Sequence, residues 1–187
     1  MASPTTLPPL SSLPAADDEI IKSTLDTLFE PSADLHDLAI PSIHESHPFH
    51  SYASLIKHVG AILLQLAQSP SSDSRTKLHG ILGSHPRLGE KKVESAQSRA
   101  EQAHLNTGNS KEKEEEAIKL KALNDEYESR FPGLRYVVFV NGRSRAIIMQ
   151  NMRERIDRGD IRAEEQEAIQ AMVDIAIDRA NKLQGPV

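Results

Sequence analysis

Apolar residues at helical spacing are the feature that most constrains how this chain can fold. Between residues 52 and 66 they recur at intervals of three and four, as Tyr52, Leu55, Ile56, Val59, Ile62, Leu63 and Leu66. This spacing places them along one face of an α-helix. Similar patterns predict a first helix that begins at Asp17 and Asp18, a long helix through Leu120 to Phe131, and helices over 76–82, 92–105, 143–158 and 163–183.

One stretch of the chain is typical of a β-strand rather than a helix. Residues Tyr136 to Val140 are apolar and partly β-branched, and the turn pair Asn141 and Gly142 follows them. No second strand is predicted to pair with this stretch, and an unpaired strand leaves its backbone groups without partners. We therefore expect an all-α, single-domain, bundle-like fold with one short extended segment near 135–141, whose amides meet something other than a strand.

The N-terminal residues differ in composition from the rest of the chain. Residues 1–16 are rich in proline and serine and carry no charged side chain, which predicts a flexible leader. Residues 17–187 then form the helical domain. A chain of 187 residues can build one well-buried core, and two domains are not expected.

Composition excludes several classes of protein. The chain has no cysteine, which rules out disulfides, a thiolate nucleophile and cysteine-bound zinc. Its net charge of −5 favours neither nucleic acid nor an anionic membrane as a partner, and no apolar run is long enough to span a bilayer. No signal peptide is apparent, so we expect an intracellular protein, either cytoplasmic or peroxisomal. The chain ends in Gly185-Pro186-Val187, which is not a peroxisomal tripeptide.

A histidine next to a proline interrupts one of the predicted helices. The stretch "ILGSHPRLG", residues 81–89, holds His85 directly before Pro86 and between Gly83 and Gly89. A residue before proline is disfavoured in the α conformation, and glycines commonly end helices. The stretch is therefore either a helix stop in which the histidine is incidental or a bend that presents an imidazole to a pocket.

Polar side chains at helical spacing form two further candidate sites. Ser98, Glu101 and Gln102 share one face of the predicted helix 92–105. This face is either solvated or suited to a ligand rich in amides. Arg179 lies in the apolar line of the last helix, so its guanidinium either extends to the edge of the apolar face or is buried and paired. A buried guanidinium could bind a carboxylate or a carbonyl.

Three histidines in "HESHPFH" raise the possibility of a metal site. His44, His47 and His50 are close in sequence, but Pro48 prevents one helix from presenting all three. Their spacing matches no established zinc pattern, so we expect no metal. A metal hydrolase built on them is an alternative that would contain stoichiometric metal.

Three short motifs follow one another along the chain. They are "HPRL" at 85–88, "SRAEQ" at 98–102, and Asn124 to Phe131 followed by the apolar stretch 136–140. In this order they resemble the 2-oxo-4-hydroxy-4-carboxy-5-ureidoimidazoline (OHCU) decarboxylases. "LFEPSADL" and "HPFHSYASLI" also resemble the N-terminal region of that family, so the resemblance covers about residues 20–183. Where the family has Phe-Gly-x-Pro-Phe-Val, this chain reads "FPGLRYVV", in which the corresponding part up to Val137 is one residue longer.

The resemblance implies an activity and a set of site residues. The activity is the cofactor-independent decarboxylation of OHCU to (S)-allantoin in urate catabolism. His85 would be the proton donor, and Glu101 would orient His85 or bind the substrate. The implied substrate-binding residues are Pro86, Ser98, Gln102, Tyr136, Val137, Val138, Phe139, Val140 and Arg179. The implied partners are a small-molecule substrate and a second copy of the chain in a homodimer.

A protein without enzymatic activity is the main alternative. A non-catalytic helical interaction module derived from the same fold would keep the apolar helix faces. It would not require His85 and Glu101 to converge on one site.

Overall fold

The computed structural model describes residues 6–89, 98–99 and 110–184, and all regular secondary structure within these ranges is helical. The elements are a 3₁₀-helix η1 (Leu10–Ala15) and the α-helices α1 (Asp18–Phe29), α2 (Ala33–His44), α3 (Tyr52–Gln68), α4 (Ser72–Leu82), α6 (Ser110–Arg130), α7 (Arg145–Arg158) and α8 (Ile161–Gln184). The predicted all-α fold is confirmed. None of the helices in these ranges is long and apolar enough to cross a membrane.

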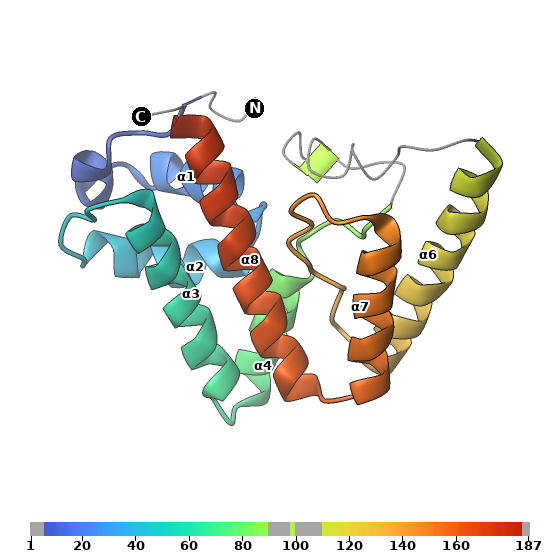
Figure 1. The fold of residues 1–187 in the computed structure, drawn as a ribbon. Helices are drawn as coiled ribbons and strands as arrows, with labels where there is room; N and C mark the ends of the chain where they lie inside the picture. Colours follow the sequence, from blue (N-terminus) through green and yellow to red (C-terminus); the bar gives the residue numbers. More distant parts are fainter. Residues whose placement is uncertain (1–5, 90–97, 100–109, 185–187) are drawn as a thin grey trace.

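Helix α8 runs through the middle of the molecule (Figure 1). It packs most extensively against α3 and next against α1. In the view of Figure 1, helices α2 and α3 lie on one side of α8 and α4 passes behind it, whereas α6 and α7 pack against each other on the opposite side. The long apolar face predicted over residues 52–66 is thus the face of α3 that packs on α8.

Local hydrogen bonds explain where several helices begin. The Ser32 hydroxyl accepts a hydrogen bond from the backbone N–H of Leu35 at the start of α2, and Ser51 and Ser54 form a capping box at the start of α3. The Asp160 carboxylate accepts from two N–H groups of the first turn of α8. This cap explains why α8 starts at Ile161, two residues before the predicted start.

Part of the predicted flexible leader is packed on the domain. Residues Leu10–Ala15 form η1, and the Leu13 side chain is fully buried. The Tyr52 hydroxyl donates to the Pro8 carbonyl at 2.5 Å. Proline removes backbone donors but leaves carbonyls that can still accept. The prediction that the leader reaches residue 16 is therefore corrected: residues of this segment contribute to the core.

The expected extended segment forms no strand. Residues 134–140 have no regular secondary structure and connect the turn after α6 to the turn at Asn141 and Gly142. The side chains of Tyr136, Val137 and Val140 belong to the buried core. The segment therefore contributes to the core without belonging to a sheet.

Candidate active site

Most of the residues predicted for the site line one cavity of about 380 Å³. Its walls come from the loop that follows α4, the irregular segment after α6, and the C-terminal half of α8. The lining residues are His85, Pro86, Leu88, Ser98, Tyr136, Val137, Val138, Phe139, Val140, Asn141, Gly142, Ile175, Asp178 and Lys182. The structure thus brings His85, Pro86, Ser98 and the five residues of 136–140 together from three parts of the chain.

The loop that carries His85 is held firmly against α6. The Arg87 guanidinium contacts Asp125 at 2.6 Å and Glu128 at 2.7 Å. The Asn124 side-chain amide donates to the Leu88 carbonyl at 3.0 Å. These contacts tie Arg87 and Leu88, which closely follow His85, to one face of α6.

The end of this loop depends on a glycine. Gly89 has a φ of +82°, a left-handed conformation that side chains disfavour. A Cβ at this position would lie 2.6 Å from Leu120 Cδ2. Gly83 at the end of α4 has an ordinary helical φ of −77° instead. Of the two glycines around His85, only Gly89 requires the conformational freedom of glycine.

The His85 imidazole is buried and unprotonated at neutral pH. Its side chain is 6% exposed, and its Nε2 has no hydrogen-bond partner among the residues that the structure describes. Burial, reinforced by the positive charge of Arg179, lowers the pKa of His85 to about 4, and the negative charge of Glu30 offsets this only in part. A neutral imidazole with an unused ring nitrogen at a cavity wall is suited to proton transfer.

Arg179 is buried and paired, which decides between the two alternatives for this residue. Its side chain is 2% exposed, and Nη2 donates to Glu30 Oε1 at 2.7 Å and to Ser98 Oγ at 3.0 Å. The Ser98 hydroxyl in turn donates to the same Glu30 oxygen at 2.6 Å. Burial opposes ionisation of Glu30, but Arg179 and the hydrogen bond from Ser98 outweigh it, and the Glu30 pKa lies below its usual value. Three side chains thus form one buried ionic cluster beside His85.

The hydrogen bonds found along 136–140 are accepted by three of its backbone carbonyl groups. The Val137 carbonyl accepts from Arg155, and the Phe139 and Val140 carbonyls accept from Arg143. Within the described ranges, no acceptor is found for the N–H groups of residues 136–140. Peptide N–H groups at a cavity wall are suitable donors to carbonyl oxygens or to a developing oxyanion.

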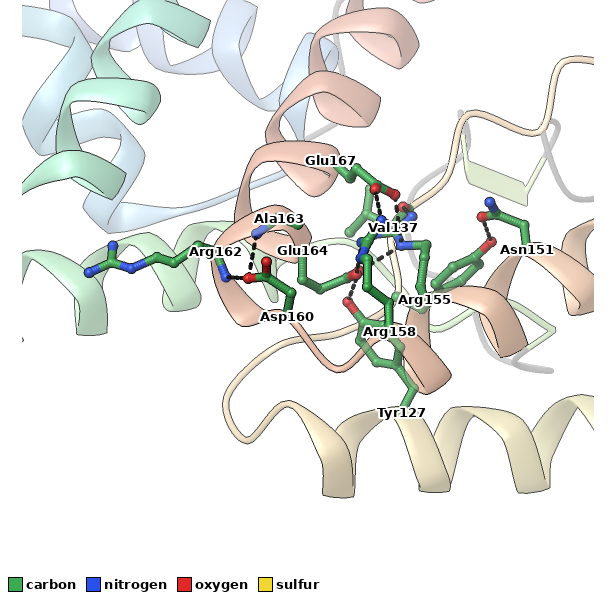
Figure 2. A network of polar contacts seen from close by, with 11 residues as sticks. Tyr127, Val137, Asn151, Arg155, Arg158, Asp160, Arg162, Ala163, Glu164 and Glu167 are labelled. Atoms are coloured by element: carbon green, nitrogen blue, oxygen red, sulfur yellow. Dashed lines mark hydrogen bonds and ion pairs between the residues drawn. The ribbon is translucent and has the colours of Figure 1, made fainter.

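A buried network holds this segment from behind (Figure 2). The Arg155 guanidinium pairs with Glu164, donates to the Val137 carbonyl at 3.1 Å and lies 4.8 Å from the centre of the Tyr136 ring. The Tyr127 hydroxyl also donates to Glu164, at 2.5 Å. Because α6, α7 and α8 each contribute to this network, it couples the position of the cavity wall to the packing of three helices.

Glu101 and Gln102 lie outside the described residues. Among those that are described, no group of three or more His, Cys, Asp or Glu side chains is arranged to hold a metal. His44 bonds instead to Asp18 and to the Pro14 carbonyl, so it helps to attach η1.

Three residues important for the site were not among the predicted site residues, although Glu30 and Asn124 lie in motifs that resemble the family. Glu30 supplies the negative charge that pairs with Arg179. Asn124 donates to the Leu88 carbonyl in the His85 loop, and Arg155 donates to the Val137 carbonyl in the segment 136–140. Glu30 had one usable signal, because it directly follows α1, where the helix dipole disfavours a carboxylate. In the sequence Arg155 looks like a solvated arginine of a charged helix, and no feature of the neighbouring residues indicates that its side chain is buried.

Comparison with known proteins agrees with the motif order. A family model described as OHCU decarboxylase matches residues 14–181. A search of curated proteins returned no match. The matched region begins inside η1, consistent with the packing of Leu13 into the core.

Proposed function

This chain belongs to the OHCU decarboxylase family, and from that premise we propose that it converts OHCU to (S)-allantoin without a cofactor. Membership of the family implies decarboxylation in urate catabolism. The observation that carries the residue-level proposal is the buried His85 Nε2, without a hydrogen-bond partner among the described residues, in a cavity that residues 136–140 also line.

The reaction needs a place for an electron pair and a proton for one carbon. When CO₂ leaves C4 of the substrate, the pair of the broken C–C bond forms a C4=C5 double bond. The former ring C=N bond and the ring carbonyl conjugated with it take up the negative charge. A proton must then reach C5 from one face while the 4-hydroxyl becomes the allantoin carbonyl. The ring nitrogen that belonged to the C=N bond takes one proton from solvent. The substrate anion and this proton together give CO₂ and neutral allantoin.

His85 is proposed to move the proton that sets the stereochemistry. As a neutral imidazole it accepts the proton of the 4-hydroxyl and returns a proton to C5, so it is regenerated in each turnover. A bound carboxylate also favours the imidazolium, because an opposite charge within a few ångström raises the pKa of histidine. His85 is therefore the proton donor in the product-forming step although it is neutral in the free site.

The remaining residues are proposed to bind and orient the substrate. The N–H groups of 136–140 suit the ring and ureido carbonyls, and their charge-stabilising effect grows as negative charge develops on the ring. Arg179 supplies donors for the carboxylate, and Pro86 shapes the wall beside His85. The Ser98 hydroxyl gives its proton to Glu30 and so contacts the substrate through its oxygen. Glu101 and Gln102 keep the roles implied by the resemblance: Glu101 orients His85 or binds the substrate, and Gln102 binds the substrate.

The test uses substrate made in situ from urate, because OHCU is unstable. The wild-type protein should accelerate the appearance of (S)-allantoin, followed by circular dichroism, over the spontaneous reaction. His85→Asn should lose about 10²–10⁴-fold in rate, the usual contribution of general acid–base catalysis. Full activity in His85→Asn would refute the assignment of His85 as the proton donor. If the wild-type protein does not accelerate the reaction, the non-catalytic interaction module is favoured instead.

A further inference from the structure

Glu30 has a backbone conformation that residues other than glycine rarely adopt. Its φ is +81° and its ψ is 152°. The extended ψ is the one that the following proline, Pro31, requires, whereas the positive φ is a strained choice for a side chain with a Cβ. Among the described non-glycine residues, only Asn141 also has a positive φ, and asparagine tolerates it better than glutamate. The chain thus bends sharply at Glu30 and directs its carboxylate inward.

The Glu30 carboxylate is buried where local effects oppose it. The residue is 3% exposed, and it directly follows the C-terminal end of α1, where the helix dipole disfavours a negative charge. A buried ion pair is weak evidence for stability, because desolvation of both charges offsets their attraction. Strain, burial and the dipole all count against Glu30 as a stabilising residue. Such a combination is typical of functional sites.

The contacts of Glu30 identify what it does. One oxygen, Oε1, accepts hydrogen bonds from both Arg179 and Ser98, which also bond to each other. Arg179 is a long side chain that could adopt other rotamers, and the Ser98 hydroxyl can rotate about the Cα–Cβ bond. One carboxylate oxygen thus contacts the guanidinium and the hydroxyl together, and the Leu28 carbonyl accepts a further hydrogen bond from Arg179 Nη1 at 3.4 Å.

We infer that Glu30 is a positioning residue, whose strained and buried carboxylate holds Arg179 and Ser98 in place beside His85 for the bound substrate. The inference rests on the proposed function, since it assigns Arg179 and Ser98 to the substrate. Glu30 itself touches no reacting atom in this assignment. Its negative charge also reaches the imidazole, where it opposes the effect of Arg179 on the protonation of His85.

The test compares Glu30→Gln with a matched control, Glu165→Gln. Glu165 is a buried acid on α8 that pairs with His79 and Arg75, outside the cavity that contains His85. Both variants remove one buried carboxylate charge, so they probe the same kind of stability loss. Glu30→Gln should lower kcat/KM by about 10–100-fold, the scale of a small misplacement of binding groups. Glu165→Gln should stay within about twofold of the wild type.

A pH profile separates positioning from mere destabilisation. Loss of the Glu30 charge lowers the pKa of His85, so the acidic limb of kcat/KM that reports His85 should move to lower pH in Glu30→Gln and stay in place in Glu165→Gln. NMR titration of the His85 ring should show the same displacement without any turnover.

A second pair of variants keeps the test decisive if Glu30→Gln folds poorly. Glycine adopts a φ of +81° without strain, so Glu30→Gly should melt at a higher temperature than Glu30→Ala, while both lose activity. If the wild type is active and Glu30→Gln matches Glu165→Gln in kcat/KM and in pH profile, the role of Glu30 is refuted and the function stands. If the wild type gives no acceleration, the proposed function and this inference fail together.

Discussion

The burial of His85 should make the stability of this protein depend on pH in a way that one substitution removes. In the unfolded chain a histidine titrates near 6.5, whereas burial and Arg179 lower the pKa of folded His85 to about 4. Between these values the unfolded state binds a proton that the folded state does not. The free energy of unfolding contributed by His85 is therefore fully present above about pH 6.5 and is lost as the pH falls toward 4.

The magnitude follows from the two pKa values. With 1.36 kcal/mol for each pH unit, the contribution of His85 should fall by about 2.5 kcal/mol between pH 7.5 and pH 4.5. This range stays above the pH at which the carboxylate of Glu30 takes up a proton, because its pKa lies below the usual value. His85→Asn carries no titrating ring at this position, so its stability lacks this contribution.

The assay is urea unfolding of both proteins at half-unit steps of pH over this range. The quantity of interest is the wild-type free energy of unfolding minus that of His85→Asn, because the seven other histidines titrate in both proteins. This difference should decrease by about 2.5 kcal/mol from the highest pH to the lowest. A difference that stays constant within about 0.5 kcal/mol would mean that folded His85 titrates normally, and the assignment of a buried, neutral imidazole would be wrong.

Three further substitutions test the framework around the cavity. Arg155→Met leaves the buried Glu164 without its closest cation and should lower the free energy of unfolding by about 3–5 kcal/mol in chemical denaturation; a loss below about 1 kcal/mol would contradict this reading of the network. Gly89→Ala and Gly142→Ala place alanine at a φ of +82° and +72°, but only the former adds a Cβ close to Leu120, at 2.6 Å. Gly89→Ala should therefore be the less stable by about 1 kcal/mol or more in thermal unfolding, and equal melting temperatures would show that Leu120 yields without cost.

Patterns local in the sequence were enough to predict most of the fold. The period of three and four in residues 52–66 predicted the buried face of α3, and the single strand-like stretch predicted an irregular segment without a sheet. Both follow from rules that involve only neighbours along the chain, the helix repeat and the need to pair backbone groups. The leader was misjudged because Leu13 is buried by residues distant in the sequence, and its local proline-rich composition does not record that contact.

The site was only partly accessible to the same reasoning. The bend at His85 and Pro86 was visible, and the motif order connected it with Ser98 and 136–140 through a family resemblance. That Arg179 is buried rather than extended to solvent could not be read from its helix, because the answer depends on a carboxylate 149 residues earlier in the chain. Glu30 and Arg155 are ordinary charged residues until the fold removes them from water.

The sequence by itself therefore determined most of the helices other than α2, the buried face of α3, and His85 as the candidate for proton transfer. Tertiary structure alone decided which charges are buried, how they pair, and that the His85 ring is neutral at pH 7. The physical reason is that helix formation is governed by contacts three or four residues apart. The pKa of a side chain instead depends on desolvation and on charges within a few ångström, whatever their separation along the chain.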